Sequence, residues 1–159
     1  MRQTLLTEEY VRLAVAAAID TLCAADEHLL AANCSERSLS HMFAVHLSSK
    51  FPGYNVDCEY NRDGFNVKKL MLGDHLSTTS EALDAVTVFP DVIVHKRGTS
   101  VHNLLVVEIK KASSADNGDF DIRKLQAFKA QMAYEFAAFI VVGYRTYDRT
   151  CLIKAIEWQ

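Results

Sequence analysis

Two acidic residues and one lysine stand in a stretch that otherwise has the composition of a buried β-hairpin. The stretch is VFPDVIVHKRGTSVHNLLVVEIKKA, residues 88–112, and the three residues are Asp91, Glu108 and Lys110. Residues two apart in a strand point to the same face, so Glu108 and Lys110 project together while Ile109 points into the opposite layer. If the two apolar runs pair, Asp91 comes close enough to Glu108 for both to share a cation. Facing carboxylates repel each other, and a hard divalent ion such as Mg²⁺ relieves this repulsion because it prefers oxygen ligands.

The lysine beside this acidic pair adds a third component of hydrolytic chemistry. Metal-assisted displacement at phosphorus needs metal ligands, a nucleophilic water and a cation that stabilises the charge building on the phosphate. Lys110 is suited to position the water or to stabilise that charge. The alternative is structural: Asp91 opens a strand after Pro90, and Glu108 and Lys110 form an ion pair on the wet face of an edge strand. We favour the metal site because all three residues belong to one hairpin.

The dipeptide Pro90-Asp91, followed by Glu108-Ile109-Lys110, resembles the PD-(D/E)XK signature of the restriction-endonuclease-like nuclease superfamily, in a bacterial branch of it. The resemblance covers residues 35–144. It implies an α/β fold of the α+β kind, with a restriction-endonuclease-like αβββαβ core in which helices flank a mixed central sheet.

The resemblance also implies a role for each site residue. Asp91 and Glu108 would be metal ligands, with the backbone carbonyl of Ile109 as a further ligand, and Lys110 would be the catalytic lysine. Glu36, on the helix before the first strand, matches the position of an extra acid that assists the metal or the water. The implied cofactor is Mg²⁺, with Mn²⁺ as a substitute.

Three basic residues are candidates for contact with nucleic acid. Lys124 matches a polar position that approaches the phosphate backbone in the family. Arg62 ends the strand beside the expected site, and Lys111 belongs to a local rim of cations around the loop that follows the hairpin. Each has a plainer interpretation: solvated charges for Arg62 and Lys111, and a surface pair with Asp121 for Lys124. Glu36 likewise could belong to a capping box or compensate the helix dipole.

The elements that must position these residues follow from apolar periodicity and from capping signals. Thr7 is the expected N-cap of the first helix, and Asp119 or Asp121 that of the third. The buried stripe of the third helix is expected to be Leu125, Phe128, Met132 and Phe136. The predicted elements are helices at 8–30, 35–50 and 120–137, strands at 54–61, 88–95, 104–111, 138–144 and 151–158, and a short strand at 66–72 in the least regular segment, 62–86.

Composition supports a single domain, with residues 1–30 as an additional N-terminal helix outside the core at 35–144. The chain has 159 residues, of which 50% are hydrophobic, and only two prolines, so a packed core is expected. The net charge of −3 argues against a protein that coats nucleic acid through general basicity. The longest apolar run, 136–144, is too short to span a bilayer, so no membrane partner is expected.

The four cysteines have no C-x-x-C spacing and are expected to be free thiols in a reducing compartment. A cytoplasmic protein is the simplest interpretation.

The expected function is that of a Mg²⁺-dependent hydrolase of phosphodiester bonds, an endonuclease or exodeoxyribonuclease acting on nucleic acid, with DNA favoured. Dimerisation into a homodimer is plausible, because one site cuts one strand. The alternative is a catalytically inactive nuclease-fold module that binds nucleic acid or a protein partner.

Overall fold

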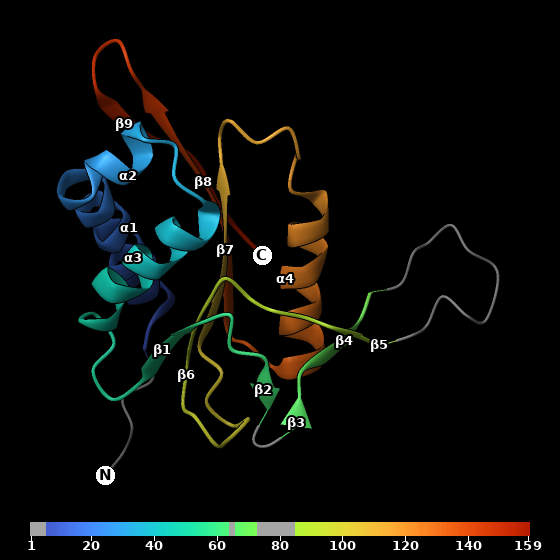
Figure 1. The fold of residues 1–159 in the computed structure, drawn as a ribbon. Coiled ribbons are helices and arrows are strands. Elements are labelled where there is room, and N and C mark those ends of the chain that lie inside the picture. The colour runs from blue at the N-terminus through green and yellow to red at the C-terminus, as the bar shows by residue number, and fades with distance from the viewer. Residues whose placement is uncertain (1–5, 64–65, 73–84) are drawn as a thin grey trace.

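One five-stranded mixed sheet with helices on both faces organises the chain (Figure 1). The computed structural model describes residues 6–63, 66–72 and 85–159. The strands of this sheet, in spatial order, are β1 (Asn55–Cys58), β6 (Val92–His95), β7 (Leu105–Lys111), β8 (Phe136–Arg145) and β9 (Thr150–Trp158). Only the β7–β8 pair is parallel, and the other three pairs are antiparallel. The prediction of a mixed sheet flanked by helices is therefore confirmed.

The first face of the sheet is covered by α1 (Glu8–Ala25), α2 (Glu27–Ala31) and α3 (Glu36–Ser48) (Figure 1). Thr7 caps α1 as predicted, because its side chain accepts a hydrogen bond from the backbone amide of Tyr10 at 3.2 Å. The predicted single helix at 8–30 is divided at Asp26. Ser35 caps α3 through the amide of Ser38, so the acid at position 36 is left available for other contacts.

The second face is covered by α4 (Asp119–Met132), which connects the parallel strands β7 and β8. The cap of α4 is Gly118, with φ 83°, and not Asp119 or Asp121. A Cβ at this glycine would collide with the ring of Phe139, so glycine allows the helix to start close against the sheet. The helix ends at Met132, earlier than predicted, and Phe136 therefore belongs to β8 and not to a helical stripe.

The hairpin of β6 and β7 lies in the middle of the sheet, and its register places the predicted acids together. Val92 pairs with Val107 and Ile93 pairs with Val106. Continued by one residue, this antiparallel register sets Asp91 opposite Glu108. Every side chain of β6 is buried, as are the first five of β7. Burial of this kind stabilises the fold by roughly 1.5–3 kcal/mol for each large apolar side chain, which fixes the register.

The remaining strands extend the sheet or pair in ribbons of two. β1 is shorter than the predicted strand at 54–61 and pairs with β6. The irregular segment forms two ribbons: β2 (Arg62–Asp63) with β3 (Asn66–Val67), and β4 (Lys69–Met71) with β5 (Ala85–Thr87). The predicted short strand at 66–72 corresponds to β3 and β4. Residues 64–65 and 73–84 of the irregular segment 62–86 lie outside the described residues.

A disulfide between Cys23 and Cys151 ties α1 to the edge strand β9. This bond contradicts the expectation of four free thiols. Cys34 and Cys58 are free. Within the described ranges, no helix has both the length and the apolar character needed to cross a membrane.

Candidate active site

Asp91 and Glu108 are held together by hydrogen bonds that cross the β6–β7 hairpin. The amide of Ile109 donates to Asp91 Oδ2 at 2.7 Å, and the amide of Asp91 lies 3.4 Å from Glu108 Oε1. The carboxylate of Asp91 is thus directed to the backbone of β7, and the carboxylate of Glu108 is directed to the backbone that leads into β6. The side chain of Ile109 is buried in the core on the α1–α3 face, and its amide is committed to Asp91. The backbone carbonyl of Ile109, which was expected to be a further metal ligand, belongs to the following peptide group, between Ile109 and Lys110, and not to the one whose amide binds Asp91.

Burial makes both carboxylates unfavourable in their charged forms. Glu108 is only 2% exposed. Its burial and the charge of Asp91 raise the pKa of Glu108 well above its ordinary value, against the opposing effect of Lys124. Burial also raises the pKa of Asp91, while the hydrogen bond from Ile109 and the charge of Lys124 act in the opposite direction. The two carboxyl groups are therefore stabilised either by binding a proton or by a positive charge close to them.

Lys124, which α4 contributes, supplies that positive charge in this structure. Its Nζ lies 2.7 Å from Glu108 Oε2 and 3.6 Å from Asp121 Oδ1, and it donates to the carbonyl of Phe89 at 3.4 Å. The side chain of Lys124 is only 10% exposed. The residue expected to approach a phosphate backbone is therefore a buried counter-ion of Glu108, and its pair with Asp121 is not on the surface.

Lys110 points to a different set of acids. Its Nζ lies 2.9 Å from Asp121 Oδ2, 3.1 Å from Asp116 Oδ2 and 4.0 Å from Glu36 Oε2. Partial burial of Lys110 would lower its pKa, but the hydrogen bonds to Asp121 and Asp116 outweigh burial and raise the pKa. Lys110 is therefore a cation at any ordinary pH. Among the described residues, the ion-pair partners of Lys110 are Asp121, Asp116 and Glu36, and not Asp91 or Glu108.

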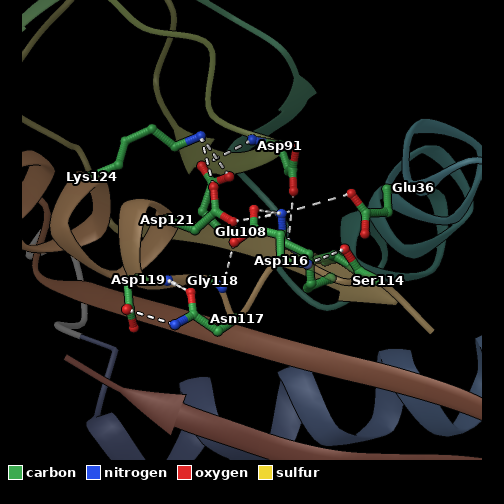
Figure 2. A network of polar contacts seen from close by, with 12 residues as sticks. Glu36, Asp91, Glu108, Ser114, Asp116, Asn117, Gly118, Asp119, Asp121 and Lys124 are labelled. Carbon is green, nitrogen blue, oxygen red and sulfur yellow. Dashed lines mark hydrogen bonds and ion pairs between the residues drawn. The ribbon is translucent and has the colours of Figure 1, made fainter. Parts of the chain in front are cut away.

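Glu36 reaches the end of β7 from the N-terminus of α3. Its Oε1 accepts a hydrogen bond from the amide of Lys111 at 2.8 Å, which places the acid beside the ammonium group of Lys110. Figure 2 shows Glu36 approaching from one side, and Asp121 and Lys124 from the other. The side chain of Lys111 turns toward Asn33, where its Nζ donates to the side-chain oxygen at 3.1 Å and lies 3.4 Å from the backbone oxygen.

We define the site cluster by its shared network of ion pairs and hydrogen bonds. Its members are Glu36, Asp91, Glu108, Lys110, Asp116, Asp121 and Lys124. Sequence reasoning did not assign Asp116 to the site and treated Asp121 only as a cap or a surface partner. The spacing of Asp121 and Lys124, three residues apart on a helix, was the available signal that both face the same way. Asp116 lies in a loop and had no such signal.

Arg62 stands apart from this cluster. It is exposed on β2, and among the described residues no hydrogen bond or ion pair joins it to the cluster. Lys111 contributes its backbone amide to Glu36, whereas its charge lies on the side of β7 that faces α3. The three basic residues predicted to contact nucleic acid are therefore not gathered on one surface.

The donor set of the cluster can be compared with the demands of Mg²⁺. No group of three or more His, Cys, Asp or Glu side chains is arranged to hold a metal ion within residues 6–63, 66–72 and 85–159. Mg²⁺ usually keeps several waters and takes only one or two carboxylates from the protein. Asp91 and Glu108 meet that smaller demand, and the raised pKa of each shows that a nearby positive charge would be favourable. Lys124 now fills this role for Glu108 and would compete with an ion.

Comparison of the chain with protein-family models, with curated proteins and with solved structures finds no match. Inference about function therefore rests on the fold and on the geometry of the site cluster.

Proposed function

We propose that this protein is a Mg²⁺-dependent nuclease of the PD-(D/E)XK kind that hydrolyses phosphodiester bonds in DNA. The observation that carries the proposal is the pair of Asp91, which is half-buried, and Glu108, which is buried, held together across a hairpin by hydrogen bonds. Lys110 follows Glu108 two residues further along the same strand. The order α3, β1, β6, β7, α4, β8 along the main sheet supports it, since this is the αβββαβ order that the resemblance implies.

Asp91 and Glu108 would hold the ion, and Lys124 would have to release Glu108 for it to enter. Bound Mg²⁺ supplies Lewis-acid chemistry, drawing charge from a phosphoryl oxygen and making water a better nucleophile. The ammonium of Lys124 would then be free to approach the phosphate, as the resemblance suggested. Asp121, only 3.6 Å from Lys124 Nζ, would keep this ammonium near the site.

Lys110 acts as a cation in this scheme, because its raised pKa rules out a role as general base at neutral pH. Its ammonium would orient the attacking water and stabilise charge on the phosphate. The water oxygen forms a bond to phosphorus while the bond to the leaving ester oxygen breaks. The proton of the water passes to a carboxylate or to solvent, and the leaving oxygen takes a proton from solvent. Glu36, 4.0 Å from Lys110 Nζ, would hold this ammonium in position.

Two exposed aromatic rings near the cluster support nucleic acid as the substrate. Phe89 is 51% exposed and its carbonyl accepts from Lys124, and Phe120 is 47% exposed and precedes Asp121. Exposed rings of this kind stack on unpaired bases, worth about 1–3 kcal/mol for each base. Stacking would offset the weak electrostatic attraction expected of a chain with a net charge of −3.

Cleavage assays test this proposal. The purified chain is incubated with single-stranded, duplex and branched DNA and with RNA, in Mg²⁺, Mn²⁺ or EDTA. We expect cleavage only with a divalent ion, and a loss of at least about 100-fold in Asp91→Asn and Lys110→Met. Asn at position 91 still offers an oxygen to the amide of Ile109, so the fold is retained. Lys96 directly follows β6 and is not a member of the site cluster. Lys96→Met is the matched control, and it should cleave like the wild type. Metal-independent cleavage, or full activity in Asp91→Asn, would exclude the mechanism.

A second candidate is a nuclease-fold module that binds nucleic acid or a protein without cutting. The ion pair of Lys124 with Glu108 favours it, because a lysine that permanently neutralises Glu108 would leave no place for a metal. Titration calorimetry with Mg²⁺ separates the two functions. Binding that disappears in Glu108→Ala favours the nuclease, whereas a folded protein that binds no divalent ion favours the module.

A further inference from the structure

A cavity of about 370 Å³ opens on the other side of β7 from Glu108 and Lys110. Its apolar wall includes Leu29 from α2, Val142 from β8 and Leu152 from β9. Lys111, Arg145 and Lys154 also line it. The volume falls within the range of small-molecule sites, roughly 300–1,000 Å³. The cavity therefore combines an apolar surface with a positive rim.

The charge of this lining is opposite to that of the chain as a whole. Its charged residues are those three cations, and no carboxylate contributes to the lining as described. Lys111 is held by the neutral oxygens of Asn33, so its charge is not cancelled. Arg145 is paired with Asp148 at 3.1 Å, and Lys154 is exposed. The lining thus complements an anion attached to an apolar group.

A shallow depression connects this cavity with the site cluster. It is lined by Asn33, Glu36, Lys111, Ser113 and Ser114. Three of these residues, at positions 33, 111 and 113, also line the cavity. Glu36 belongs to the site cluster, and its bond to the amide of Lys111 marks the boundary between the two. The depression therefore adjoins both the site cluster and the cavity.

We infer that the cavity is a nucleotide subsite, which receives one unpaired nucleotide of the substrate strand next to the bond that is cut. The base would lie against the leucines at 29 and 152, and the phosphate would face Lys111 and Lys154. A base must leave its stack to enter such a pocket, which is easiest in a single strand or at a mismatch. This inference rests on the proposed nuclease function and specifies its substrate class as nucleic acid with unpaired nucleotides.

Binding of mononucleotides in EDTA tests the subsite separately from cleavage. Nucleoside 5′-monophosphates, the matching nucleosides and inorganic phosphate are titrated into the intact protein and followed by calorimetry and by amide chemical shifts. We expect the monophosphates to bind at least tenfold more tightly than either nucleoside or phosphate. Shifts should concentrate at Lys111, Ser113 and Gly143. Absence of binding at millimolar concentration overturns the inference.

Variants assign the binding to the cavity. Leu152→Trp fills the space and should abolish binding, and Lys154→Glu should weaken it at least tenfold. Lys154 is exposed, so its variant should fold even if Leu152→Trp does not, and thermal melting checks both. Lys96→Glu is the matched control, and it should bind within twofold of the wild type. Unchanged binding in the folded cavity variants overturns the assignment.

The two proposals fail in distinguishable ways. Cleavage of DNA without mononucleotide binding overturns the subsite and leaves the nuclease. Mononucleotide binding that Lys154→Glu weakens, in a protein that never cleaves, supports the subsite and overturns the nuclease.

Discussion

The ion pair of Lys124 with Glu108 gives a quantitative test of the site electrostatics. Lys124→Met keeps most of the apolar volume of the side chain and removes the ammonium group that lies 2.7 Å from Glu108 Oε2. Breaking a buried pair in this way costs about 3–5 kcal/mol, because the remaining charge is uncompensated. Glu108 can avoid that cost by binding a proton. The loss of stability in the variant should therefore depend strongly on pH.

The sign of this dependence follows from the raised pKa of Glu108. A raised carboxyl pKa means that the folded state holds a proton that the unfolded state has released, so stability falls as pH rises. Keeping Glu108 protonated costs 1.36 kcal/mol for each pH unit above its unfolded pKa of about 4.3. This sets a ceiling of about 1 kcal/mol at pH 5 and about 5 kcal/mol at pH 8. Because burial already raises the pKa of Glu108 in the wild type, with Lys124 present, these ceilings are upper bounds on the loss. We expect Lys124→Met to lose up to about 3–5 kcal/mol at pH 8 and at most about 1 kcal/mol at pH 5.

Urea denaturation at pH 5 and pH 8 measures these losses, with Lys96→Met as the control for removal of a half-buried lysine outside the site cluster. The double variant Glu108→Gln with Lys124→Met should recover most of the stability, because both members of the pair are then neutral. Mg²⁺ should stabilise Lys124→Met more than the wild type, since it no longer competes with the ammonium. Equal losses at the two pH values, or a loss below about 1 kcal/mol at pH 8, would refute the buried pair.

Three further predictions concern Glu36 and the cysteines. Glu36→Gln keeps an acceptor for the amide that it binds, so we expect an unchanged melting temperature and cleavage reduced by about 10–100-fold; a large loss of stability would point to a capping role. Cys58 is an exposed residue, but partial burial of its thiol and then the charge of Asp91 raise its pKa to about 11, from 9.0. Iodoacetamide at pH 8 should therefore modify Cys58 more slowly than in the unfolded chain, by up to about 100-fold; similar rates would contradict this environment. Loss of the bond between Cys23 and Cys151, 128 residues apart, should lower the free energy of unfolding by about 2–5 kcal/mol. No change on adding reductant would show that the bond is not formed in solution.

The sequence predicted the elements that have strong local signals. The first helix could be predicted from its cap and its apolar periodicity, and the β6–β7 hairpin from its two apolar runs. The pairing of Asp91 with Glu108 followed from the hairpin, because alternation fixes which residues share a face. The buried strand at 138–144, which forms most of β8, was equally readable from its length and β-branched residues.

Other features depend on contacts between distant segments and had no local signal. The end of α4 at Met132 requires a left-handed Ala133, which periodicity does not indicate. Cys23 and Cys151 meet only because β9 returns along β8 to lie near α1. Lys124 forms the ion pair with Glu108, whereas Lys110, which was predicted to lie beside this acid, pairs with Asp121. This arrangement depends on how α4 packs against β7. Spacing within one hairpin could not reveal it.

The most direct test of the central claim is a crystal structure with Mn²⁺, examined by its anomalous signal. We predict one strong peak in contact with the carboxylates of Asp91 and Glu108, with the ammonium of Lys124 moved away from Glu108. The account is contradicted if no peak is found there at saturating Mn²⁺, with Lys124 still bound to Glu108.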